Sequence, residues 1–291
     1  MKITETRTQQ LLVNKKTIGQ SIMVNGIDVY FEHYPHPSAT KTILCIHGFL
    51  SSTFSFRSLI PLLNKDYQIL SVDLPPFGKS GKTMDYCYSY KNLAATIIEL
   101  VDKLQLRSVI LAGHSLGGQI CLNMIHQQPK KFEKAILLAS SGYLRKAKQI
   151  AIACSYLPFF HLLIKRKLAR SGGVEGNLAQ VVYDPSQITE EMVHGYLQPF
   201  IENDEIFRGL TKLLRDREGD LPSEVLQNIR VPCLLIWGDS DKIVPLSVGK
   251  RLHNDLPNSE LVIMKRTSHL IPEEKPKETA SYIKRFIDTD F

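Results

Sequence analysis

Short apolar runs that end abruptly at glycine or at a polar residue constrain this chain more than any other feature. They do not alternate with polar residues, which is typical of strands buried on both faces of a sheet. Six such runs occur: Thr42–Ile46, Tyr67–Val72, Ser108–Ala112, Ala135–Ala139, Cys233–Trp237 and Leu261–Met264.

Helical repeats of apolar residues lie between these runs. They cover Tyr90–Leu104, Leu116–Gln127, Ser247–Leu256 and Lys277–Ile287. Short buried strands that alternate with helices predict a mostly parallel sheet covered by helices on both faces. Ligands of such sheets bind outside the carboxyl ends of the strands. Ahead of them, Ser21–Tyr34 alternates around Asn25-Gly26, which predicts a β-hairpin.

One segment interrupts this alternation. Residues 143–221 contain no strand-like run followed by a turn, and they read as several helices separated by proline and glycine. We therefore predict a helical lid inserted into the sheet domain, and we call residues 143–221 the cap segment. The predicted organisation is an N-terminal extension (1–20), a first part of the core (21–142), the cap segment, and a second part of the core (222–291).

The sequence Gly-His-Ser-Leu-Gly at residues 113–117 follows a predicted strand and opens a predicted helix. A serine at the apex of such a sharp turn is strained and exposed, and the flanking glycines let neighbouring backbone pass close by. This context favours Ser115 as a nucleophile. The alternative is an ordinary tight turn in which the serine caps the helix.

A serine hydroxyl needs a base to take its proton. His126 lies in the helix after the turn, two other histidines lie in the cap segment, and His253 lies within a helical repeat. His269 follows the last strand in a loop, from which its side chain can reach over the sheet. We therefore select His269 as the base and interpret His253 as a surface residue.

A third residue, an acid, completes the catalytic triad of a serine and a histidine, and in this kind of sheet it lies between them along the chain. Asp239 and Asp241 follow the strand Cys233–Trp237, and we select Asp241 to hold and orient the imidazole. Asp239, directly after Gly238, is expected to bond backbone N–H groups of the turn. The preceding strand is followed by Ser140-Ser141 and offers no carboxylate.

Acyl transfer also needs hydrogen-bond donors for the oxyanion. We assign the backbone N–H of Leu116 as one donor and that of Phe49, in the loop after the first buried strand, as the second. His47 in the same loop is expected to brace it through a hydrogen bond rather than to act as the catalytic histidine.

Five segments, in this order, resemble the α/β-hydrolase superfamily: HGF, DLPPFGKS, GHSLGG, WGDSDKIVP and SHLIPEEKP. The resemblance extends over about residues 20–288 and is greatest to bacterial hydrolases with a helical cap, grouped with carboxylesterases, lipase-like enzymes and carbon–carbon bond hydrolases. It implies an eight-stranded, mostly parallel sheet, a triad of Ser115, Asp241 and His269, and oxyanion amides at Phe49 and Leu116. Pro76 departs from the pattern of these relatives, which have glycine there.

The composition of the chain argues against several classes of protein and of ligand. The polar N-terminus has no apolar region of a secretory signal, and no apolar stretch is long enough to span a membrane. The five cysteines are scattered, without metal-ligand spacing, and indicate free thiols in a reducing cytoplasm. No cofactor, metal or nucleic-acid partner is expected, despite a net charge of +7.

The segment 144–170 carries seven basic residues and no acidic one, with an apolar centre. One interpretation is a cap helix packed over the active site with solvated charges at its ends. The other is a lipophilic acyl pocket under a lid whose basic rim meets anionic lipid or an anionic substrate.

We expect a hydrolase of carboxylic esters with small or lipophilic acyl groups, acting through an acyl-enzyme. A carbon–carbon bond hydrolase acting on vinylogous diketones could use the same triad, and the same site can show perhydrolysis as a side reaction. A different class is a ligand-binding module without turnover. The sequence assigns neither a physiological substrate nor an oligomeric state.

Overall fold

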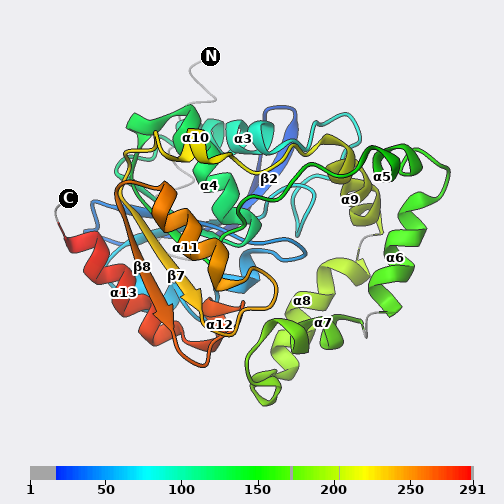
Figure 1. Ribbon diagram of the computed structural model, residues 1–291. Coiled ribbons are helices and arrows are strands. Elements are labelled where there is room, and N and C mark those ends of the chain that lie inside the picture. Colours follow the sequence, from blue (N-terminus) through cyan, green and yellow to red (C-terminus); the bar gives the residue numbers. More distant parts are fainter. Residues whose placement is uncertain (1–17, 171–172, 203, 290–291) are drawn as a thin grey trace.

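A single eight-stranded sheet organises the chain (Figure 1), in the order β1-β2-β4-β3-β5-β6-β7-β8. The computed structural model describes residues 18–170, 173–202 and 204–289. The predicted N-terminal extension, residues 1–20, lies outside them except for its last three residues. The strands are β1 (Ile18–Val24), β2 (Ile27–Tyr34), β3 (Thr42–Ile46), β4 (Gln68–Val72), β5 (Val109–His114), β6 (Phe132–Leu138), β7 (Cys233–Gly238) and β8 (Ser259–Met264).

All six apolar runs form strands, and the predicted hairpin is confirmed as β1 and β2. Asn25 and Gly26 both have positive φ, 47° and 78°, as a tight hairpin turn of this kind requires. Strand β2 pairs antiparallel with β4, whereas every pairing from β4 to β8 is parallel. The central strands β3 and β5 are buried along their whole length, which explains why their sequences do not alternate.

Helices cover both faces of the sheet (Figure 1). One face carries α3, α4, α10 and α11, and the other carries α13, which packs on α2. The core helices and 3-10 turns are η1 (Thr53–Phe56), α2 (Ile60–Leu63), α3 (Tyr90–Lys103), α4 (Leu116–Gln127), η2 (Pro129–Lys131), α10 (Ser223–Leu226), α11 (Leu246–Asp255), α12 (Ile271–Glu274) and α13 (Pro276–Asp288). The α/β-hydrolase fold class is thereby confirmed.

The cap segment lies at one end of the sheet (Figure 1). Its elements are α5 (Gln149–Cys154), α6 (Phe160–Arg170), α7 (Gly173–Val181), η3 (Pro185–Gln187), α8 (Glu190–Glu202) and α9 (Glu205–Asp216). Its two ends meet at Leu144 and Asp220: the amide of Asp220 donates to the carbonyl of Leu144 over 2.8 Å, and the amide of Leu144 donates to Asp220 Oδ2 over 3.1 Å. The chain therefore leaves the sheet and returns to it through one narrow neck.

No helix among the described residues is both long and apolar enough to cross a bilayer.

The crossing of β3, β5 and α4 leaves no room for side chains at two glycines. A Cβ on Gly117 would lie 2.0 Å from the carbonyl oxygen of Ile46, and a Cβ on Gly113 would lie 2.5 Å from the backbone of Gly117. These are backbone contacts, which cannot rotate away as a side chain can. The two glycines therefore set how closely α4 approaches the sheet.

We predict that Gly117→Ala lowers the free energy of unfolding by about 3 kcal/mol, because β3 or α4 must move to admit the methyl group. Urea denaturation followed by circular dichroism measures this. The matched control is Gly142→Ala, whose Cβ would meet only side chains at 3.1 Å or more, and we expect it within about 1 kcal/mol of the wild type. Equal losses in the two variants would contradict the interpretation.

Candidate active site

Ser115 occupies the sharp turn between β5 and α4. Its φ of 52° and ψ of −116° lie outside the favoured regions for a residue with a side chain. The turn is held by backbone bonds: the amide of Ser115 donates to Leu138 O, and its carbonyl accepts from Ser141 N and Gly118 N, all at 2.9–3.0 Å. These hydrogen bonds thus hold the backbone of Ser115 in its strained conformation. The residue remains partly accessible to solvent.

Asp241 and His269 form a buried hydrogen-bonded pair. His269 Nδ1 lies 2.8 Å from Asp241 Oδ2, and both side chains are almost fully enclosed. The other carboxylate oxygen, Oδ1, accepts the amides of Ile243 and Val244 at 2.8 and 2.9 Å. A carboxylate can only accept, so it fixes the proton on Nδ1 and leaves Nε2 of the imidazole as a proton acceptor.

The backbone of His269 is held on two sides. Its amide, and that of Leu270, donate to the carbonyl of Val181, the last residue of cap helix α7, at 2.9 and 3.2 Å. Its own carbonyl accepts Nε2–H of His114 at 2.9 Å, and the two imidazole centroids are 4.9 Å apart. His114 directly precedes Ser115, so this contact places the histidine loop beside the serine turn.

Two glutamates brace the loop from α12. Glu274 accepts the amide of Ser268 at 3.0 Å and that of Tyr183, in the cap segment, at 2.7 Å. Glu273 pairs with Arg57 and accepts Ser58 Oγ at 3.0 Å. Sequence reasoning assigned these glutamates no role. The only signal was their position directly after the histidine, in the segment SHLIPEEKP.

The loop after β3 lies against the serine. A Cβ on Gly48 would come within 3.1 Å of both Ser115 Cβ and His114 Nδ1, so glycine eases this close approach. Phe49 follows at once, with its side chain half exposed and its ring edge-on to Phe77. The backbone at residue 49 is therefore beside the serine turn, where the sequence expected an oxyanion donor.

Leu116 is the first residue of α4. The first amides of a helix have no partner within it, and the helix dipole adds partial positive charge there. Both residues predicted to supply oxyanion amides thus adjoin the serine turn, Leu116 along the chain and Phe49 through Gly48.

The loop histidine, His47, braces the chain as expected. Its Nε2 accepts the amide of Leu74 at 2.9 Å, so the proton sits on Nδ1, which donates to Gly48 O at 2.7 Å. Burial lowers its pKa to about 4 and that of His114 to about 3. Both imidazoles are therefore neutral at pH 7 and add no positive charge beside the serine.

The candidates that the sequence set aside lie elsewhere. Asp239 accepts the amide of Arg266 at 3.0 Å and serves the turn. His253 is exposed on α11 and contacts Ser259. The sequence offers no carboxylate directly after β6, but in the fold the carboxylate of Asp220 lies there. Ser141 Oγ donates to Asp220 Oδ2 at 2.7 Å. Asp220 ties the neck of the cap segment there, and the histidine bonds Asp241 instead.

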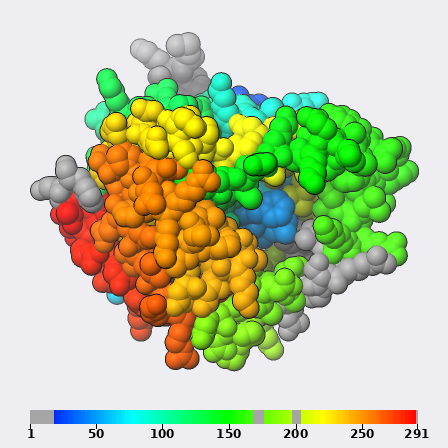
Figure 2. All heavy atoms as spheres, in the orientation of Figure 1, coloured from blue at the N-terminus to red at the C-terminus, as the bar shows by residue number. Residues whose placement is uncertain are grey.

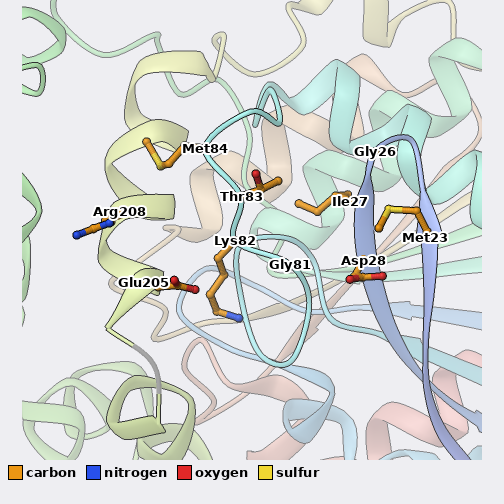
Figure 3. Close-up of a pocket in the computed structure, with 10 residues that line it drawn as sticks. All are labelled: Met23, Gly26, Ile27, Asp28, Gly81, Lys82, Thr83, Met84, Glu205 and Arg208. Atoms are coloured by element: carbon orange, nitrogen blue, oxygen red, sulfur yellow. The ribbon is translucent and has the colours of Figure 1, made fainter.

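Two hollows of the described structure lie in different places. Figure 2 shows an opening between the green atoms of the cap segment and the orange atoms near α11, with blue atoms from early in the chain at its floor. A separate pocket of about 450 Å³ lies between the β1–β2 turn, the loop 81–84 and α9 (Figure 3). Lys82 and Glu205 line that pocket, and none of the five predicted site residues does.

Within the described ranges, no three His, Cys, Asp or Glu side chains gather as a metal site requires.

Comparison with known proteins agrees with the fold. Residues 41–276 match the family described as alpha/beta hydrolase fold. The chain is 49% identical over 264 residues to the uncharacterized hydrolase YugF of Bacillus subtilis, covering 91% of this chain and 96% of that one. The chain therefore belongs to the α/β-hydrolase family and is a hydrolase.

Two further relatives are more distant. The chain is 25% identical to a 2-hydroxy-6-oxononadienedioate/2-hydroxy-6-oxononatrienedioate hydrolase of Paraburkholderia phymatum, covering 92% of this chain and 93% of the relative. Among solved structures, the 2-hydroxy-6-oxo-6-phenylhexa-2,4-dienoate hydrolase of Rhodococcus sp. strain RHA1 superposes with a TM-score of 0.79 at 20% identity, covering 94% and 99% of the two chains. This second likeness supports the fold.

The buried state of His47 yields a pH prediction. Its pKa falls from about 6.5 in the unfolded chain to about 4 in the fold, so the folded state binds fewer protons between these values. The stability it contributes is complete above pH 6.5 and is lost as the pH falls toward 4. We expect the imidazole ¹⁵N shifts of His47 to remain those of the neutral, Nδ1-protonated ring from pH 7 to 5.5. A protonation within that range would contradict the assignment.

Proposed function

We propose that this protein is a serine hydrolase that cleaves carboxylic esters through an acyl-enzyme. One observation carries the proposal: the buried bond between Asp241 and His269 stands beside the strained turn of Ser115. An imidazole whose Nδ1 proton is held by a carboxylate has a free Nε2 to act as a base, and a serine in such a turn is presented for attack.

The proposed reaction has two halves. His269 removes the proton of Ser115 as its oxygen attacks the ester carbonyl, and then gives that proton to the leaving alcohol as the ester bond breaks. Water next gives a proton to His269 and attacks the acyl group, and the histidine returns the proton to Ser115 as the acid departs. Asp241 stays ionised and stabilises the imidazolium in both halves.

The amides of Phe49 and Leu116 would hold the oxyanion of both tetrahedral intermediates. Backbone donors suit this task because the packed turn already orients them, so no reorganisation is needed when charge develops. The neutral His47 contributes by fixing the loop that carries Phe49, without adding a competing charge.

The choice of an ester rests on three arginines of the cap segment. A hydrolase of carboxylated diketones, such as the relative from Paraburkholderia, would need a group to bind the substrate carboxylate. Arg215 bonds Ser155 at 2.8 Å and covers the ring of Tyr156, Arg217 bonds the carbonyl of Arg145, and Arg208 lines the separate pocket. Arg215 and Arg217 are held by these contacts and Arg208 lines a different pocket, which favours a substrate without that charge.

A binding module without turnover remains the alternative of another class. A fluorophosphonate probe separates the two classes, because it labels only a serine that a base activates. A covalent adduct on Ser115 in the folded protein, found by peptide mass spectrometry, supports the hydrolase. A protein that stays unlabelled while it binds lipophilic ligands would favour the module.

We also propose a cytoplasmic location. Cys45, Cys121 and Cys233 are buried free thiols, as is typical of a reducing compartment.

We predict that His269→Gln and Asp241→Asn each lower kcat for a short p-nitrophenyl ester by roughly 10³–10⁴-fold. The first variant removes the base, and the second removes the carboxylate that keeps His269 in the required tautomer. His253→Gln is the matched control, since this exposed histidine lies on α11, and we expect it to keep the wild-type kcat. A ring-cleavage diketone is assayed in parallel. Faster turnover of the diketone than of every ester would replace the ester proposal with the carbon–carbon alternative.

A further inference from the structure

Helices α5 and α6 and the turn between them, which we call the outer limb of the cap segment, expose an unusual amount of apolar surface. We call the following six residues of α5, α6 and the turn between them the apolar tip: Ile150, Tyr156, Leu157, Phe159, Leu162 and Leu163. The exposed fraction is 71% for Phe159 and 77% for Ile150. Single exposed apolar residues are ordinary, but a group on one projecting limb marks a surface that meets another phase or molecule. Figure 1 shows α5 and α6 at the outer edge of the molecule.

The limb is anchored from inside, so this exposure is a property of its outer face. Helix α6 packs on α9, and Ile164 contacts the main core. At the end of α5, Ser155 is buried and binds Arg215 through its hydroxyl and its carbonyl. The turn then passes through Phe159 with φ of 61°, a value that a bulky residue seldom adopts.

Basic side chains border the apolar tip on both sides. Arg145, Lys146 and Lys148 are exposed before it, and residues 165–167 (Lys-Arg-Lys) are exposed after it. Lys165 pairs with Asp204. No acidic residue occurs anywhere from 144 to 170. The limb thus presents an apolar centre and a positively charged margin to solvent.

We infer that the apolar tip docks on the surface of a membrane that contains anionic phospholipid. Apolar side chains enter the boundary between headgroups and acyl chains, while lysine and arginine pair with the phosphates. A second copy of this chain fits less well, because a two-fold contact through the tip would set basic margin against basic margin. An acidic protein or nucleic acid would match the charges but leave the apolar side chains without a partner.

The test is flotation of the full chain with two kinds of vesicle, phosphatidylcholine alone and phosphatidylcholine mixed with phosphatidylglycerol. We expect at least about tenfold more protein bound to the mixed vesicles, and loss of binding at high salt, because salt screens the basic margin. Negligible binding to both kinds of vesicle overturns the inference.

Two pairs of variants locate the contact. Leu157→Ser/Phe159→Ser removes exposed apolar surface from the tip, and Met23→Ser is its control, because Met23 is also exposed but lies in β1. Lys146→Glu/Lys148→Glu reverses charge at the margin, and Lys130→Glu/Lys277→Glu makes the same change at exposed lysines elsewhere. We expect each tip variant to lose most vesicle binding and each control to keep it. Equal effects within either pair overturn the assignment to the tip.

A fluorescence measurement reports insertion directly. The single tryptophan, Trp237, is fully buried, so a Phe159→Trp variant adds the first exposed indole. Its emission should shift to shorter wavelength with the mixed vesicles and not with phosphatidylcholine alone. A blue shift that instead follows protein concentration without vesicles, together with dimer formation in sedimentation, would replace the membrane by a second copy. Hydrolysis of a soluble p-nitrophenyl ester, measured without vesicles, tests the proposed function separately from this inference.

Discussion

Close backbone packing where β3, β5 and α4 cross is the constraint on which the rest of the structure depends. Gly113 and Gly117 let the helix approach the sheet to a distance that no side chain would permit, and Gly48 lets the neighbouring loop lie against Ser115. The serine is held at positive φ because these contacts leave its backbone no alternative. The strain at one residue is therefore offset by packing that involves three elements of the core.

The core and the residues of the candidate site could be predicted because their signals are local. A strand buried on both faces must be apolar throughout, so each such strand can be recognised as an unbroken apolar run. A serine between two glycines after such a strand indicates a sharp turn. Asp241 and His269 follow from position as well, since each stands just beyond a strand end. The roles of these residues in catalysis stay a prediction, as do the boundaries of the cap segment.

What the sequence did not reveal depends on contacts between distant segments. In the sequence His114 is only part of the Gly-His-Ser-Leu-Gly turn, whereas in the structure its ring donates to the carbonyl of His269. Asp220 reaches the strand end that seemed to lack a carboxylate, because the cap segment returns to its starting point. Neither contact has a spacing or a periodicity that sequence reasoning could detect. The cap helices are also short and irregular, so which of their faces is buried depended on the fold.

The carbonyl of Val181 has a consequence for how motion is shared in this molecule. It accepts two amides of the loop that carries His269, so the inner limb of the cap, α7 and α8, cannot shift without disturbing the imidazole. Leu270 from the same loop packs among Leu178, Val182 and Met192, which strengthens this link. Opening of the cap by a rigid swing would thus dismantle the proton acceptor. A ligand can therefore enter and leave with the site intact only while the inner limb stays in place.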